Sequence, residues 1–224
     1  MEQKITYKEK TTRSTDDRLT MFFLVFSILA AIILPLSSIW RENVGIYDNV
    51  IRLHVLANSD SDEDQALKYL VRDNILTEVS EIVSSAKTFD DAKAALSENL
   101  GRIKAAAEQT IAENGSGEKI NVTLTHEKYP VRTYKNVTLP AGGYTSLRVL
   151  IGEAEGKNWW CVLFPKLCTS FAKKGSDKIR VADDAEELMI EAGLTRSQIQ
   201  LMTGDTPDIV IRFRLLEFLE SIFG

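Results

Sequence analysis

The feature that most constrains what this chain can fold into is a run of 22 residues, 19–40, that contains no charged side chain. A helix of about 20 apolar residues crosses the roughly 30 Å hydrocarbon core of a bilayer, so the run is long enough to span a membrane. It is apolar on every face, unlike the amphipathic helices of a soluble core. Lysines and arginines in residues 1–18 precede it, and such flanks favour the cytoplasmic side. The sequence therefore predicts a cytoplasmic segment at 1–18, a membrane-spanning segment at 19–40 and export of the residues that follow.

Two kinds of export segment fit this run, an uncleaved signal-anchor and a cleaved signal peptide. A signal peptide has a shorter apolar core and ends in small residues before its cleavage point. Here the run is long, and Pro35 or Leu36 stands where a small residue would be needed before Ser37 and Ser38. The pattern favours the anchor and leaves cleavage open.

The exported part divides into a short tether at 41–49 and a domain at 50–224. Residues 41–224 contain 22 lysines and arginines against 28 aspartates and glutamates, a net charge of −6. No basic stripe is present to neutralise phosphates, which argues against a nucleic-acid partner.

Hydrophobic periodicity predicts a strand and two helices in the first half of the domain. From Ile51 to Ala57 every second residue is apolar, which indicates a strand with one buried face at 50–57. Ser61 and Asp64 have the spacing of a capping box, and apolar residues recur behind them at steps of three and four. This pattern predicts an amphipathic helix at 61–84, and a similar pattern predicts a second one at 89–113.

Further along the chain the period changes from helical spacing to strict alternation. It predicts one long strand or two at 118–134, with Pro130 at an edge or a break, and strands at 144–151 and 159–164 that pair as a hairpin. We expect weak structure at 169–182, short helices at 183–202 and an amphipathic helix at 208–223. The order predicts an α+β fold in which one antiparallel sheet is covered by two long amphipathic helices and a C-terminal helix.

The sequence lacks the motifs of common enzymes, metal sites and cofactor sites. It has no nucleophile elbow, phosphate-binding loop or zinc-protease motif, and its two histidines, His54 and His126, are too few for a histidine-rich metal site. Alternate aspartates at 60–64 are spaced like the start of a calcium loop, but Gln65 stands where that loop needs glycine. Acids at a helix N-terminus explain them better. We therefore expect no catalytic residue, no metal, no cofactor and no small-molecule substrate.

The segment 157–168 holds two of the three tryptophans and both cysteines. Exported cysteines seven residues apart fit a small disulfide loop between Cys161 and Cys168, and a pair of buried free thiols is the alternative. A catalytic cysteine is disfavoured. Neighbouring residues on a strand point to opposite faces, so one of Trp159 and Trp160 is expected in the core and the other outside or under a helix. An outward tryptophan is a candidate partner contact.

Three blocks of residues between 50 and 168 have a combined spacing that is highly specific. They are Ile51-Arg52-Leu53-His54-Val55-Leu56-Ala57-Asn58-Ser59-Asp60-Ser61 with Asp64-Gln65, Leu67-Lys68 and Val71-Arg72-Asp73; Pro140-Ala141-Gly142 with Tyr144 and Leu147-Arg148; and Ile151-Gly152 with Asn158-Trp159-Trp160-Cys161-Val162, Phe164-Pro165 and Leu167-Cys168. The blocks resemble the stage II sporulation protein R family of endospore-forming Firmicutes. Two positions depart from the family pattern, since Lys166 replaces a proline and Ala154 a glycine.

The resemblance implies a signalling protein, not an enzyme, that is exported across the forespore membrane into the space between the forespore and mother-cell membranes. There it would activate a membrane-embedded aspartic protease, stage II sporulation protein GA, which processes the precursor of the mother-cell sigma factor E. An extracytoplasmic cell-wall-binding module and a cell-wall or peptide hydrolase are the alternatives.

A partner surface is expected at one end of the sheet, where the loop at 58–65, the turn at 140–144 and the tryptophan pair would meet. The candidate partner-binding residues are Asn58, Ser59, Asp60, Ser61, Asp64, Gln65, Arg72, Gly142, Tyr144, Asn158, Trp159 and Trp160.

Overall fold

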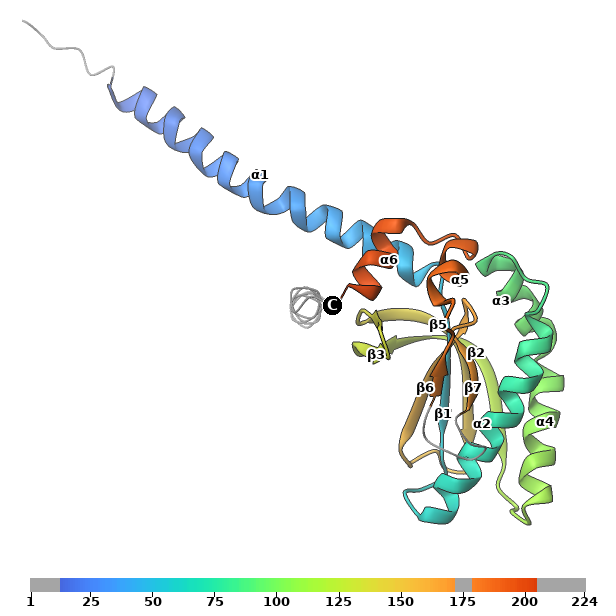
Figure 1. The fold of residues 1–224 in the computed structure, drawn as a ribbon. Helices are drawn as coiled ribbons and strands as arrows, with labels where there is room; N and C mark the ends of the chain where they lie inside the picture. The colour runs from blue at the N-terminus through green and yellow to red at the C-terminus, as the bar shows by residue number, and fades with distance from the viewer. Residues whose placement is uncertain (1–12, 172–178, 205–224) are drawn as a thin grey trace, which may run out of the picture. The chain divides into compact units, whose positions relative to one another are not determined.

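The structure, a computed structural model, describes residues 13–171 and 179–204 (Figure 1). Within these ranges it describes only the backbone of residues 13–17, 35–44, 169–171 and 179–181. The chain divides into two compact units, residues 1–41 and 42–224, which we describe separately. The predicted helix at 208–223 lies outside the described residues.

Most of the first unit is the N-terminal part of helix α1 (Arg13–Tyr47). Its apolar side chains are exposed on all sides, with Phe22 at 65% and Leu34 at 67%. Over the described residues, no helix is both long and apolar enough to cross a membrane. The membrane span expected at 19–40 stays a prediction, because the side chains of its residues 35–40 are not among those described.

The second unit is built on a four-stranded sheet with the order β2-β5-β1-β6. Its strands are β1 (Ile51–Leu56), β2 (Ile120–Tyr129), β5 (Gly142–Ile151) and β6 (Asn158–Phe164). Strand β1 runs parallel to β5 and antiparallel to β6. The expectation of a purely antiparallel sheet is therefore wrong, and so is the hairpin of 144–151 with 159–164. Alternation shows which face of a strand is buried, but it does not show that β1 inserts between two strands that follow each other in sequence.

Three helices follow β1, and α2 and α4 lie along one face of the sheet (Figure 1). Helix α2 (Asp62–Ile82) begins as predicted, with the Ser61 side chain accepting a hydrogen bond from the backbone of Asp64. The single helix expected at 89–113 is instead two, α3 (Phe89–Glu98) and α4 (Leu100–Glu113), separated at Asn99. The buried core includes Leu53 and Val149 of the sheet and Ile75 of α2.

The opposite face of the sheet is covered over part of its length by a hairpin of β3 (Arg132–Tyr134) and β4 (Val137–Leu139) (Figure 1). Helix α6 (Arg196–Thr203) lies against β4, and α5 (Ala185–Glu191) precedes it, as the pattern at 183–202 predicts. Strands β7 (Cys168–Phe171) and β8 (Ile179–Val181) pair with each other. The expectation of weak structure throughout 169–182 is thus wrong for these two strands.

The start of β5 depends on a glycine because the backbone there approaches Tyr47 closely. Gly142 has φ +154°, and a Cβ atom at this position would lie 2.4 Å from Tyr47 Cζ. The Tyr47 hydroxyl donates a hydrogen bond of 2.6 Å to the Ala141 carbonyl, which holds the ring in place.

We predict that Gly142→Ala lowers the free energy of unfolding by about 2 kcal/mol, because the new methyl group overlaps the held ring. The matched control is Gly101→Ala in α4, where a Cβ meets no atom within 4 Å. This control should raise stability by up to about 1 kcal/mol through helix propensity. Urea denaturation of both variants measures the difference, and equal effects would contradict the close approach.

Candidate functional site

The predicted partner loop at 58–65 is held by hydrogen bonds to its own chain. Asn58 accepts a bond of 2.9 Å from the Glu153 backbone N–H and donates one of 3.0 Å to Asp64. Ser59 donates a bond of 2.6 Å to the same Asp64 carboxylate. These two side chains lower the pKa of Asp64 below its ordinary value. The loop therefore locks the start of α2 to the turn after β5.

A second set of contacts joins α2 to the residue that precedes β6. The Lys68 ammonium is buried and donates to Gln65 Oε1 at 2.6 Å and to the Lys157 carbonyl at 3.0 Å. Desolvation, helped by the charge of Arg72, lowers the pKa of Lys68 to about 8. Asp60 accepts a bond of 2.7 Å from the Lys157 backbone N–H. Ala154 in this turn has φ +58°, a left-handed conformation that glycine adopts without strain.

The turn at 140–144 lies at the other end of the sheet. Parallel pairing puts Leu56 beside Leu150 and Ile51 beside Thr145, so the loop after β1 and the turn before β5 are separated by the length of the strands. Tyr144 is fully buried, and its hydroxyl donates to the Pro140 carbonyl at 2.7 Å. The expectation that the three candidate segments meet at one end is therefore wrong, because it assumed an antiparallel sheet.

The two tryptophans point to opposite faces of the sheet, as the strand pattern predicts. Trp159 is 7% exposed and lies on the helical side, where the buried Arg72 guanidinium of α2 is 4.7 Å from its ring centroid. Arg72 is also paired with Asp73 at 2.5 Å. Trp160 lies on the other side, with His54 stacked on it at 5.5 Å and the Arg132 guanidinium 4.1 Å above its ring.

Next to this tryptophan, His54 is the centre of a polar cluster. Its Nδ1 lies 3.2 Å from the Glu127 carboxylate, and its Nε2 lies 2.7 Å from the Asn158 side-chain oxygen. Glu127 also faces Arg148 Nε at 3.1 Å. Burial alone would raise the pKa of Glu127, but hydrogen bonds from His54 and Ser146 and the charges of His54 and Arg148 outweigh it, so the pKa is lowered.

The cluster has the orienting half of a hydrolase triad but not the reacting half. In a triad, one imidazole nitrogen faces a carboxylate and the other faces the hydroxyl or thiol that attacks the substrate. The second nitrogen of His54 faces the Asn158 amide instead. In the part of the chain that the structure describes, no group of three or more His, Cys, Asp or Glu side chains could hold a metal ion.

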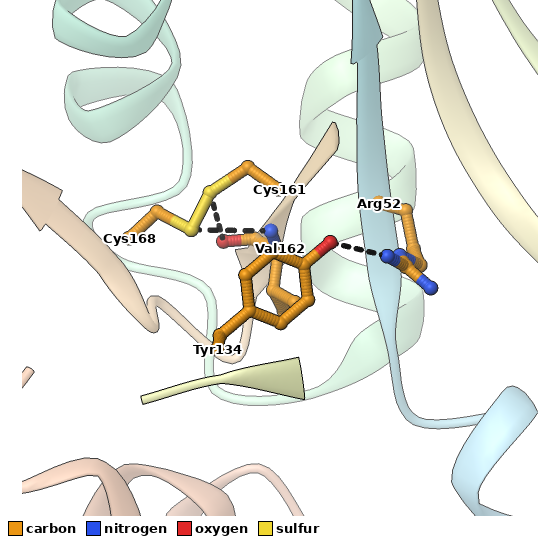
Figure 2. Close-up of a disulfide and its surroundings, with 5 residues drawn as sticks. All are labelled: Arg52, Tyr134, Cys161, Val162 and Cys168. Carbon is orange, nitrogen blue, oxygen red and sulfur yellow. Dashed lines mark hydrogen bonds between the residues drawn. A yellow bond between two sulfur atoms is a disulfide. The ribbon is translucent and has the colours of Figure 1, made fainter. Parts of the chain in front are cut away.

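A buried arginine that is absent from the predicted partner-binding residues lies on the same face of the sheet. Arg52 is 0% exposed, and its guanidinium lies 4.0 Å from the ring centroid of Tyr129 and 5.1 Å from that of Tyr144. It donates a bond of 2.5 Å to the Tyr134 hydroxyl (Figure 2). The alternation of apolar residues in 51–57 placed Arg52 on the opposite side of the strand from the predicted buried face, and that opposite side was expected to face solvent. Three tyrosines at 129–144 were the signal that an aromatic layer covers this side.

The two cysteines join β6 to the start of β7. Cys161 and Cys168 form a disulfide, with their Cα atoms 6.4 Å apart, and the Val162 backbone N–H faces Cys168 Sγ at 3.3 Å (Figure 2). Cys161 of β6 is fully buried and lies opposite Leu53 of β1, so its side chain is on the helical face of the sheet. His54 is on the opposite face, which removes the arrangement that a Cys-His nucleophile needs.

Together these features define a mixed α+β domain whose motif residues connect the sheet, the helices and the turns. The chain belongs to the stage II sporulation protein R family, whose model matches residues 47–174. It is 31% identical over 192 residues to stage II sporulation protein R of Bacillus subtilis (strain 168). The aligned part covers 82% of this chain and 86% of that protein. No solved structure gives a significant match. Family membership assigns the chain a role in sporulation.

The lowered pKa of Glu127 predicts how stability changes with pH. A carboxylate whose folded pKa lies below its ordinary value of 4.5 stabilises the fold above that value, and the contribution is lost as the pH falls through the folded pKa. We therefore expect Glu127→Gln to be less stable than wild type near pH 7, with the difference shrinking below about pH 4.5.

The matched control for this experiment is Glu108→Gln, which removes an exposed carboxylate that pairs with Lys104 on α4. It should change the free energy of unfolding by well under 1 kcal/mol at every pH. Chemical denaturation from pH 3 to 8 measures all three proteins. A pH-independent difference between wild type and Glu127→Gln would refute the assigned ionisation.

The disulfide gives a further expected outcome. Unfolded but unreduced protein should show no reactive thiol, and reduction should lower the free energy of unfolding by about 2 kcal/mol, because the reduced chain regains the entropy of a seven-residue loop. Thiol titration in denaturant, followed by urea curves with and without reductant, measures both. Two reactive thiols in the protein as exported would show that the pair is free.

Proposed function

We propose that this chain is an exported signalling protein that activates a membrane-embedded aspartic protease, stage II sporulation protein GA, and so triggers processing of the sigma-E precursor in the mother cell. The observation that carries the proposal is the family match at 47–174, which includes all four strands of the main sheet. The chain would act from the space between the two membranes. The apolar run at 19–40 supports export, either as a membrane anchor with a cytoplasmic N-terminus or as a cleaved signal peptide.

Action by contact rather than by catalysis is supported by the environment of the reactive side chains. His54 is bonded to Glu127 and Asn158, the two cysteines are joined to each other, and Lys68 is buried between two acceptors. Each of these groups is thus already bonded to another part of the domain, at the atoms that a substrate would have to reach. The hydrolase alternative therefore gains no support from the site.

The cell-wall-binding alternative would use an aromatic ring as a platform for sugars. Trp159 is buried under Arg72, and the ring of Trp160 already carries His54 and Arg132. A sugar ring would have to displace one of these partners before it could stack on Trp160. We therefore retain activation of the protease as the proposed function.

The test is co-expression of this chain, the protease and the sigma precursor in a host that does not sporulate. We expect the processed sigma factor on an immunoblot when all three are present, and only the precursor when this chain is omitted. A protease with its catalytic aspartate replaced controls for host proteases. Equal processing with and without this chain would reject the proposed function.

The variant His54→Asn separates contact from catalysis in the same assay. If this chain acts as a ligand, a folded and abundant His54→Asn protein should lose processing only as far as it loses binding to the protease, with fold measured by thermal unfolding. Complete loss of processing by a folded and abundant variant that still binds the protease would support a catalytic histidine instead.

A further inference from the structure

One half of the sheet face opposite α2 and α4 is left uncovered by the described elements. The β3–β4 hairpin closes the half that contains Arg52, Ser146 and Tyr144, all of which are fully buried. The strand register shows which side chains lie on the same face farther along, toward the C-terminal ends of β1 and β5. The side chains named below are all at least partly exposed. We call this surface the open half-face, and its members are Thr123, Arg148, Leu150, His54, Leu56, Asn158 and Trp160.

The open half-face is positively charged although the domain is acidic. Arg148 has a side chain that is 40% exposed, and Arg132 lies over Trp160 at the border with the hairpin. The carboxylate that faces them from the same side of the sheet is Glu127, which contacts both His54 and Arg148. Within the named residues of the open half-face and its border, two guanidinium groups thus lie near the Glu127 carboxylate, on a chain whose residues 41–224 carry a net charge of −6.

One of these arginines has a donor that no other described residue uses. Arg132 Nε is buried from solvent and has no hydrogen-bond partner within residues 13–171 and 179–204. A buried donor without an acceptor destabilises the free protein, and an acceptor that pairs with it on binding removes that penalty. Arginine forks match carboxylates in geometry, and arginine and tryptophan are the residues most enriched at the energetic centres of protein interfaces.

We propose that the open half-face docks an acidic segment of a protein partner, with carboxylates on Arg132 and Arg148 and apolar side chains on Leu56 and Leu150. The identity of that partner as the protease rests on the proposed function, but the chemistry of the surface does not. An anionic membrane is recognised by clusters of about four or more basic side chains near the surface. The open half-face and its border offer two arginines, so we assign it to a peptide.

The direct test uses purified full-length protein and a synthetic peptide of ten glutamates, titrated by tryptophan fluorescence. Saturable binding is expected for wild type, and Arg132→Gln with Arg148→Gln should weaken it at least about tenfold, since two charge-assisted contacts are lost. The matched control is Lys93→Gln with Lys104→Gln, which removes the same charge from exposed positions on α3 and α4. It should bind the peptide as wild type does.

Two further measurements complete the test. Thermal unfolding of each variant shows that weaker binding is not loss of fold, and phosphatidylglycerol vesicles replace the peptide in a parallel titration. Equal peptide binding by the two double variants, or no binding by wild type, would overturn the proposal. Loss of vesicle binding rather than peptide binding on replacing the two arginines would overturn it in favour of a membrane.

The co-expression assay links the surface to the protease. If wild type activates processing, Arg132→Gln with Arg148→Gln should reduce it while the lysine control does not. If wild type fails to activate processing, the proposed function is rejected, and the peptide titration still decides whether the open half-face binds an acidic segment. The two proposals therefore fail by different results.

Discussion

The position of β1 between β5 and β6 is the constraint on which the rest of this domain depends. β1 is parallel to one neighbour and antiparallel to the other, so its C-terminal end lies beside both the end of β5 and the start of β6. The loop that follows β1 consequently meets the turn at 152–157, and Asn58 and Asp60 bond to the backbone of that turn. The same pairing sends the 140–144 turn to the opposite end. The three blocks that resemble the family pattern are thus held together by one strand.

A central strand must also bury its second face, and there the sequence places an arginine. Burying a guanidinium without an acid beside it is costly, and aromatic rings offset part of that cost through cation–π contacts. Tyr129 and Tyr144 supply these contacts from β2 and β5, and Tyr134 supplies a hydrogen-bond acceptor from β3. The β3–β4 hairpin is therefore fastened over Arg52. This explains why one half of the face is closed and the other half is open.

The sequence predicted local structure well and strand partners poorly, for a physical reason. Helix α2, its Ser61 cap and the opposite orientations of Trp159 and Trp160 all follow from the periodicity of neighbouring residues. The place of β1 in the order β2-β5-β1-β6 depends on pairs such as Ile51 with Thr145 and Leu56 with Asn158, which are far apart in the sequence and which no local pattern records. Burial of Arg52 depends on the same order, because two of the tyrosines that surround it, Tyr129 and Tyr144, come from β2 and β5. The three candidate segments were expected at one end of the sheet, and they lie at two ends for this one reason.

The use of hydrogen bonds inside the domain separates residues that shape it from residues that are free to recognise a partner. Asn58, Asp64 and Lys68 belong to the family-like blocks, and each already bonds to its own chain. A partner that engaged them would first have to break those bonds, with the loss of about 1 kcal/mol or more for each. Arg132 and Arg148 differ, because the first has an unused buried donor and the second is partly exposed. Asn58, Asp64 and Lys68 thus help to build the domain. Arg148, although it belongs to one of the same blocks, and Arg132 form the surface that we propose for recognition.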